Sequence, residues 1–221
     1  FIKLGTYASH SGMKTKKFIP AARFHFLTPL YDIGSSLLGF GKNYRKNVIA
    51  ALNLPNKKLT VLDAGCGTGS LAIDIKRLKP KLALHGIDAD FEILSRAQKK
   101  AHDAYVTITF KRDYLQEISY PKGSFDVVYS SLVFHHLSKE VKSDAVKEIY
   151  RILKRRGSFY LVDFGKTKKF SLFPWYAKIF EKGEDNFKGN LHKMLAKAGF
   201  KSVMTIEELP RGVQILRASK P

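Results

Sequence analysis

Short apolar runs alternate with amphipathic helical patterns from residue 59 to residue 163 of this 221-residue chain. The apolar runs predict strands at 59–63, 82–87, 105–110, 124–130 and 157–163. The patterns between them predict helices at 69–78, 90–102 and 139–153. Because helices that connect successive strands make those strands parallel, the alternation predicts an α/β fold with a mostly parallel sheet covered on both faces.

The C-terminal part of the chain continues this pattern in a different order. A helix is predicted at 188–198, and Gly199 follows it as a C-terminal cap. Two further strands are predicted at 201–206 and 212–218, separated by a Pro-Arg-Gly turn. Their short connection predicts an antiparallel hairpin at one edge of a seven-stranded sheet.

The flanking segments divide the chain without adding a second domain. Residues 1–19 are polar and basic and predict a flexible lead, whereas residues 20–221 are expected to form one domain. Within it, apolar residues at helical spacing predict an N-terminal helical cap at 20–56. The segment 165–187 carries several aromatic residues next to a basic run, and we interpret it as a second cap or lid.

The charge of the chain is strongly positive, with 39 Lys and Arg residues against 19 Asp and Glu residues and a formal net charge of +20. Such a charge favours nucleic acid, an anionic membrane surface or acidic small molecules, and it is also compatible with an ordinary solvated surface. Cys66 is the single cysteine, so an internal disulfide and a cysteine-cluster metal site are excluded. We expect a cytoplasmic protein, with a peripheral position at the inner face of the membrane as a second expectation, because no apolar run approaches membrane-spanning length.

A glycine-rich turn, LDAGCGTGS at 62–70, joins the first strand of the alternating region to the first helix. Its glycines, Gly65, Gly67 and Gly69, follow a G-x-G-x-G pattern. A phosphate-binding P-loop is disfavoured because no lysine follows the last glycine, and a dinucleotide site is disfavoured because the third glycine comes one residue early. The turn still indicates that a ligand approaches the backbone closely.

An acidic residue follows the second predicted strand, where Asp88 ends the stretch LHGID. A carboxylate at this position accepts hydrogen bonds from the two hydroxyls of a ribose in sheets of this type. Capping of the next helix is the alternative role for Asp88, although Asp90 fits that role equally well. Together with the glycine turn, Asp88 predicts a site for a nucleoside.

Several stretches resemble, in order, the motifs of class I S-adenosylmethionine-dependent methyltransferases. These are VLDAGCGTGSLAIDI, HGIDAD, FKRDYLQEI, FDVVYSSLVFHHL and LKRRGSFYLVDF, between about residues 59 and 164. The N-terminal FLTPLYDIGSSLLGFGKNYRKNVIAALNL and the C-terminal MLAKAGFKSV and ELPRGVQILRASKP resemble a narrower group, the ubiquinone/menaquinone-biosynthesis C-methyltransferases and their relatives. The resemblance implies a Rossmann-like fold and S-adenosylmethionine as the methyl donor, with S-adenosylhomocysteine as its product.

The resemblance also implies a set of residues around the methyl donor. The three glycines would lie against its methionine and ribose parts, Asp63 would orient the turn or meet the ammonium group, and Asp88 would hold the ribose. Asp113 and Tyr114 would lie at the adenine, and Ser130 at the sulfonium. The remaining members of the implied set are Tyr31, Cys66 and Ala89, with Tyr31 closing over the methionine end and Cys66 packing inside the turn.

Two adjacent histidines, His135 and His136, follow the fourth predicted strand, where the transferred methyl group is expected. Either is a candidate general base, since the pKa of an unperturbed histidine is near 6.5. The alternative is that they begin a helix and line the cofactor pocket. No metal site is expected, because adjacent histidines are expected to point apart and no carboxylate partner is evident from the sequence.

The sequence leaves the methyl acceptor open. We expect a small-molecule or lipid-like acceptor, of the quinone-precursor or phospholipid type, with contact to an anionic membrane as a further expectation. One alternative is methylation of RNA through the basic surface, and another is a cofactor-binding regulatory subunit without catalysis. The oligomeric state is not indicated by any pattern in the sequence.

Overall fold

A computed structural model of the chain describes residues 39–165 and 190–221. Its helices are α2 (Lys42–Leu52), α3 (Ser70–Leu78), α4 (Phe91–Asp103), α5 (Lys139–Ile152) and α8 (Asn190–Lys197). Its strands are β1 (Thr60–Ala64), β2 (Ala83–Asp88), β3 (Thr109–Arg112), β4 (Phe125–Ser131), β5 (Leu153–Phe164), β6 (Lys201–Leu209) and β7 (Val213–Ser219). Two short 3-10 turns, η3 (Phe134–His136) and η6 (Pro210–Gly212), complete the described elements.

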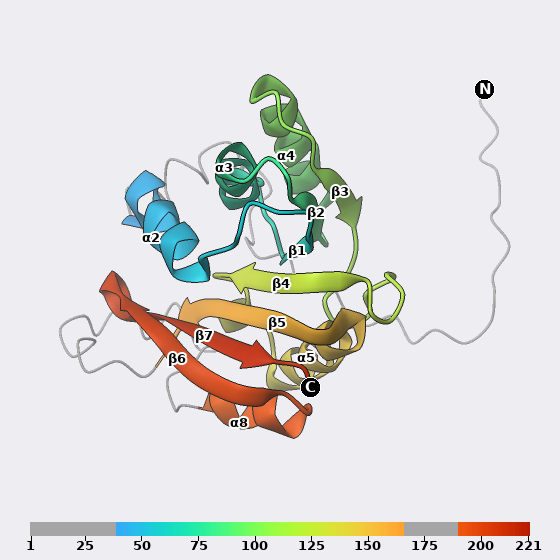
Figure 1. Cartoon of the computed structure of the whole chain (residues 1–221), viewed down its shortest axis with the longest axis vertical. Coiled ribbons are helices and arrows are strands. Elements are labelled where there is room, and N and C mark those ends of the chain that lie inside the picture. Colours follow the sequence, from blue (N-terminus) through green and yellow to red (C-terminus); the bar gives the residue numbers. More distant parts are fainter. Residues whose placement is uncertain (1–38, 166–189) are drawn as a thin grey trace, which may run out of the picture.

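The seven strands form one sheet in the order β3-β2-β1-β4-β5-β7-β6 (Figure 1). Strands β1 to β5 pair in parallel, and β7 pairs antiparallel with both β5 and β6. The sequence order reverses direction between β1 and β4, which is where ligands bind in open α/β sheets. The predicted mostly parallel seven-stranded sheet with an antiparallel edge hairpin is therefore confirmed.

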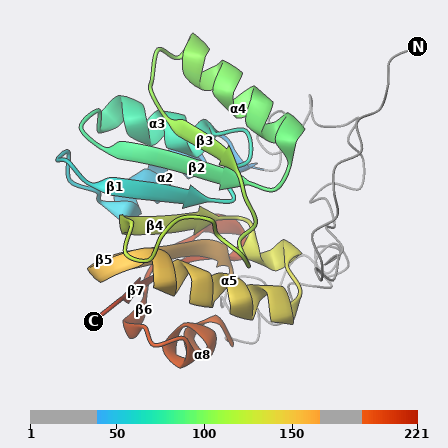
Figure 2. The ribbon, with the colours of Figure 1, turned by 90° about the vertical axis from the view of Figure 1, so that its right-hand side faces the viewer.

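Helices cover both faces of the sheet (Figure 2). Val48 and Leu52 of α2 and Leu71 of α3 pack on one face, together with Val61 of β1. The opposite face is covered by α5 and α8 and includes Leu62 of β1. Neighbouring residues of β1 thus face opposite helical layers, as expected for strands buried on both sides. This two-sided burial gives the central strands their continuous apolar runs.

Helix starts are set by side chains that accept hydrogen bonds from backbone N–H groups left unpaired in the first turn. Asp90 caps α4, accepting from the backbone N–H of Glu92 at 2.9 Å and of Ile93 at 3.2 Å. Ser138 caps α5 by accepting from the N–H of Val141 at 3.4 Å. Because Asp90 performs the capping at α4, Asp88 is left for another role.

Three predicted strands have boundaries that are wrong by three residues or more, and one of them is the strand predicted at 201–206, which continues to Leu209. The strand expected at 105–110 is observed at Thr109–Arg112, because Tyr105 has a positive φ of 55° and is 95% exposed in the turn that leaves α4. The strand expected from 157 begins at Leu153, directly after α5, so residues 154–156, which separated the predicted helix from the predicted strand, lie within β5. The pairing of β4 with β5 is irregular between Phe125 and Val127, where these additional residues are accommodated.

The predicted flexible lead at 1–19 and the lid at 165–187 lie outside the described residues, apart from Gly165 at the end of the first range. Of the predicted N-terminal cap at 20–56, the structure describes residues 39–56, which include α2. Within residues 39–165 and 190–221, none of the helices combines the length and the apolar character that crossing a membrane requires.

Candidate cofactor and active site

The glycine turn lies between the end of β1 and the start of α3, at the edge where the parallel strands end. Gly65 has a φ of +83°, and a Cβ at this position would lie 2.6 Å from the Val133 side chain. Gly67 has a φ of +52°, and a Cβ there would meet no atom within 4 Å. Gly65 is thus required by close packing, whereas open space lies over Gly67, where a ligand can reach the backbone.

Asp63, at the end of β1, is buried and has one carboxylate oxygen without a partner. Its Oδ2 accepts a hydrogen bond from the Tyr129 hydroxyl at 3.0 Å. Its Oδ1 has no hydrogen-bond partner among the described residues. Burial raises the pKa of Asp63 to about 8; the Tyr129 hydrogen bond opposes this shift and the negative charge of Asp88 adds to it. An unpaired buried carboxylate oxygen indicates a ligand, and a cationic group would fit it best.

Asp88, at the end of β2, binds the glycine turn directly. Its Oδ2 accepts from the backbone N–H of Gly67 at 2.9 Å, and its Oδ1 accepts from the N–H of Asp90 at 3.0 Å. Burial raises the pKa of Asp88, and these backbone hydrogen bonds oppose that shift. Each carboxylate oxygen still has capacity to accept another hydrogen bond, so Asp88 holds the turn and remains suited to a ligand hydroxyl.

Asp113 is less available than the sequence implied. It is buried, its Oδ1 accepts from the backbone N–H of Tyr114 at 3.0 Å, and its Oδ2 accepts from both the N–H and the hydroxyl of Ser119, at 3.0 and 2.6 Å. Its backbone N–H in turn donates to the Asp88 carbonyl at 3.0 Å. Asp113 therefore organises the turn after β3 next to Asp88, and its place at an adenine remains a prediction.

The other implied cofactor residues take mostly structural positions. The Cys66 thiol is buried, and burial is the main reason why its pKa lies well above the ordinary value, so the thiol stays protonated. The Ser130 hydroxyl donates to the Ala64 carbonyl at 2.7 Å and is fully buried. Tyr114 and Ala89 both contact Arg112, through the Tyr114 hydroxyl and the Ala89 carbonyl. Tyr31 lies outside the described residues.

Two further contacts at this edge were not predicted from the sequence. The Tyr44 hydroxyl of α2 lies 3.0 Å from the Ser131 hydroxyl at the end of β4. Lys100 of α4 donates to the hydroxyls of Thr68, at 3.1 Å, and Ser70, which flank Gly69 at the end of the turn. Tyr44 and Ser131 are 87 residues apart in the sequence, and Lys100 and Thr68 are 32 residues apart, so only the tertiary fold reveals these contacts.

The two histidines differ sharply in environment. The Nδ1 atom of His135 lies 2.9 Å from Oδ1 of Asp163, at the end of β5, and both side chains are buried. Asp163 also accepts from the backbone N–H of His135 at 3.2 Å and of Phe164 at 2.7 Å. His136 is exposed. Since a carboxylate accepts hydrogen bonds, Asp163 favours the tautomer of His135 with its proton on Nδ1.

The sequence argument that these histidines point apart is wrong, because their ring centres are only 3.8 Å from each other. A carboxylate partner, which no local pattern revealed, is also present in Asp163. In the described part of the chain, no three His, Cys, Asp or Glu side chains come together in an arrangement able to hold a metal ion.

The glycine turn and the two carboxylates lie within a segment that matches a known protein family. Residues 61–157 match the family described as "Methyltransferase domain". Over these residues the chain is similar to the class I S-adenosylmethionine-dependent methyltransferases, as the ordered motifs predicted. The match covers β1 to the first part of β5 and therefore includes the glycine turn, Asp88 and the two histidines.

Three known proteins illustrate this similarity. A "Ubiquinone/menaquinone biosynthesis C-methyltransferase UbiE" of Rickettsia akari is 30% identical over 156 residues, which cover 68% of this chain and 62% of that protein. A "Demethylmenaquinone methyltransferase" of Deinococcus radiodurans is 29% identical over 143 residues, covering 64% of this chain and 58% of the relative. A crystal structure of a "SAM dependent methyltransferase from Aquifex aeolicus" superposes with a TM-score of 0.70 at 20% identity, covering 93% of this chain and 100% of that one. The chain thus matches about three fifths of the length of these curated relatives.

Proposed function

We propose that this chain transfers a methyl group from S-adenosylmethionine to a small-molecule acceptor. The observation that carries the proposal is the buried Asp63, whose unpaired Oδ1 lies at the same sheet edge as Asp88 and the open space over Gly67. S-adenosylmethionine carries an ammonium group and a ribose, which match an unpaired carboxylate oxygen and a second carboxylate that retains acceptor capacity. The residues present therefore fit this cofactor.

S-adenosylmethionine, when bound, supplies a methyl group activated by the sulfonium. The protein has to bind and orient the two reactants and exclude water, because alignment alone removes much of the barrier. In the proposed site, Asp63 binds the ammonium group, Asp88 binds the ribose, and the backbone around Gly67 lies against the cofactor. The acceptor would lie beyond the ends of β4 and β5, beside His135.

His135 is the better placed of the two histidines for moving a proton. Its Nδ1 is bound to Asp163, so in this proposal a proton from an acceptor oxygen or carbon would go to Nε2. Asp163 would act as a positioning residue, because it fixes the ring and the tautomer without touching the acceptor. A quinone precursor or a lipid-like molecule with an ionisable hydroxyl or an activated carbon fits this arrangement.

A methyl-transfer assay with labelled S-adenosylmethionine and a fractionated cell extract tests the proposal. We expect label in the lipid or small-molecule fraction, and its absence in Asp88→Ala, with melting curves to confirm that this variant folds. Label in the RNA fraction would contradict a small-molecule acceptor. Binding of S-adenosylhomocysteine without transfer into any fraction would favour a non-catalytic subunit.

The pH profile of methyl transfer distinguishes a role of His135 in proton transfer from a purely structural role. Asp163→Asn should lower kcat and shift the pH dependence of kcat, while calorimetry still shows S-adenosylhomocysteine binding. His136→Ala is the matched control and should leave kcat and its pH dependence unchanged. An unaltered pH profile in His135→Gln, with normal folding, would assign the pair a purely structural role.

A further inference from the structure

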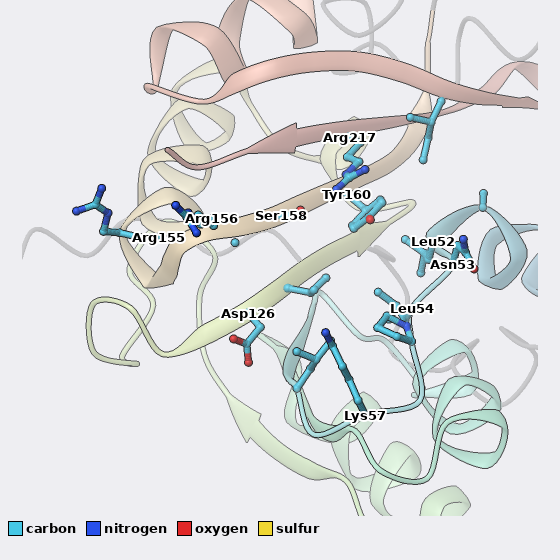
Figure 3. Close-up of a pocket in the computed structure, with 16 residues that line it drawn as sticks. Leu52, Asn53, Leu54, Lys57, Asp126, Arg155, Arg156, Ser158, Tyr160 and Arg217 are labelled. Atoms are coloured by element: carbon cyan, nitrogen blue, oxygen red, sulfur yellow. The ribbon is translucent and has the colours of Figure 1, made fainter.

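A cavity of about 610 Å³ opens at the opposite edge of the sheet, where the parallel strands begin (Figure 3). Its walls are the segment that follows α2, the starts of β4 and β5, and the facing parts of β6 and β7. Asp126 lies at this end of β4, and Ser131 lies at the cofactor end, five residues later. At roughly 3.3 Å per residue, the two edges are about 16 Å apart, so this cavity is separate from the cofactor site.

Four cationic side chains from three separate segments line this cavity. They are Lys57 before β1, Arg155 and Arg156 in β5, and Arg217 in β7. Figure 3 shows Lys57 on the loop below the cavity and Arg156 and Arg217 on the strands above it. No ion pair joins any of the four to a carboxylate within residues 39–165 and 190–221.

The one carboxylate in the cavity lining is already neutralised. Both oxygens of Asp126 lie 2.9 Å from the Lys154 ammonium group, and Oδ2 also accepts from the backbone N–H of Thr60 at 2.8 Å. Among the described residues, the charges of the four lining cations are therefore not balanced by an acid at the cavity. An anion bound there would balance part of this charge.

We infer that this cavity binds a phosphate-bearing small molecule of about nucleotide size. Three of the four cations are arginines, whose planar guanidinium groups match the oxygens of a phosphate in pairs. A volume of about 610 Å³ lies within the range of small-ligand sites. The Ser158 hydroxyl and the Asn53 side chain add polar groups to the wall.

The surroundings of the cavity favour this ligand over a membrane or RNA. A membrane-binding surface combines basic residues with exposed apolar anchors. The large exposed apolar residues of the described chain, Leu78, Phe91, Tyr105 and Met204, do not line the cavity. Single-stranded RNA requires exposed aromatic rings for base stacking. The Tyr160 ring in the wall is only 8% exposed, and the Arg217 guanidinium lies 5.8 Å from its centre.

The inference does not depend on methyl transfer, because S-adenosylmethionine has no phosphate and its proposed site is at the other edge. It also gives a role to part of the positive charge that the cofactor site leaves unused. A phosphorylated ligand at this edge would bind at the same time as the methyl donor.

Calorimetry with sodium pyrophosphate and with ADP, at about 0.1 M salt, tests the inference. We expect saturable binding with one site per chain, weakened about tenfold in Arg156→Gln and further in Arg156→Gln/Arg217→Gln. Lys99→Gln is the matched control: it removes one positive charge from α4, where the side chain is 80% exposed, and should change affinity less than about twofold. Melting curves check that each variant is folded.

If Lys99→Gln weakened pyrophosphate and ADP binding as much as Arg156→Gln, the binding would reflect general charge attraction. That result would overturn the inference. Absence of saturable binding by the folded wild-type protein would also overturn it. Binding of an RNA oligonucleotide or of phosphatidylglycerol vesicles that depends on Arg156, without binding of pyrophosphate or ADP, would replace the small ligand by that partner. S-adenosylhomocysteine binding should be unchanged in Arg156→Gln, which keeps this outcome distinct from failure of the proposed methyl transfer.

Discussion

Cofactor binding should depend steeply on pH because of Asp63. With a pKa of about 8 before the ligand binds, only about one Asp63 in eleven is ionised at pH 7, and about one in a hundred at pH 6. The ligand ammonium group stays mostly protonated in this range and pairs with the ionised carboxylate. The dissociation constant of S-adenosylhomocysteine should therefore rise about ninefold from pH 7 to pH 6.

Calorimetry measures this effect in two independent ways. The dissociation constant is determined across the pH range, and the heat is compared in two buffers with different ionisation enthalpies, which counts released protons. Nearly one proton should leave Asp63 for each ligand bound. Asp63→Asn is the matched variant, because it keeps the size of the side chain and cannot ionise. It should bind roughly ten- to hundredfold more weakly at pH 7.5 and show neither the pH slope nor the proton release.

Asp63→Asn, which should weaken ligand binding, should stabilise the ligand-free protein. Since burial raises the folded-state pKa of Asp63 above its ordinary value, its contribution to stability is greatest below pH 3.8 and is lost as the pH rises towards 8. Burying the ionised carboxylate at pH 8 therefore costs free energy that a neutral amide does not, and Asp63→Asn should raise the melting temperature of the ligand-free protein at that pH. A flat wild-type affinity between pH 6 and pH 7 without proton release, or an equal slope in Asp63→Asn, would refute the reasoning.

Four other substitutions test separate parts of the structure. Asp88→Asn should weaken S-adenosylhomocysteine binding at least about tenfold in calorimetry, because one carboxylate charge and its hydrogen bond are lost; unchanged affinity would remove Asp88 from the site. Gly67→Ala should lose about 1–2 kcal/mol of stability because of the positive φ at this position, and its Cβ should block ligand binding. Gly65→Ala should lose more stability, because its Cβ also clashes with the Val133 side chain. Equal melting temperatures of the two variants would contradict this difference in packing. Lys220→Met should lower the free energy of unfolding by about 2 kcal/mol in urea titrations, because the Lys220 ammonium group donates to carbonyls at the end of α5 at 2.7 Å; a loss no larger than that of an exposed lysine would contradict this role.

The sequence predicted the sheet, its edge hairpin and the glycine turn because each depends on local patterns. Apolar runs set the strands, and Gly65 and Gly67 occupy backbone conformations with positive φ that favour glycine. The predicted strand boundaries near Tyr105 and Leu153 were wrong because residues were assigned to strands or to connections from their apolar or basic character alone. Whether such residues enter a strand depends on the neighbouring strand, which local patterns do not reveal.

The site was predicted in part for the same reason. Asp63 and Asp88 follow strands directly, so their meeting at one edge follows from the parallel sheet. The partnership of His135 with Asp163 joins residues 28 positions apart, and nothing in the spacing distinguishes it from chance. The three hydrogen bonds that engage Asp113 likewise depend on the fold of the turn around Ser119.

The position of β7 between β5 and β6 has a consequence for synthesis of the chain. Strand β7 is the last of the seven to leave the ribosome, and both of its neighbours precede it in the sequence. Until it emerges, one edge of β5, a buried and mostly apolar strand, presents unpaired backbone groups, and β6 lacks the strand with which it pairs among the described residues. The sheet therefore cannot be completed before β7 has been synthesised. A nascent or truncated chain that lacks β7 should be prone to aggregation and in need of a chaperone.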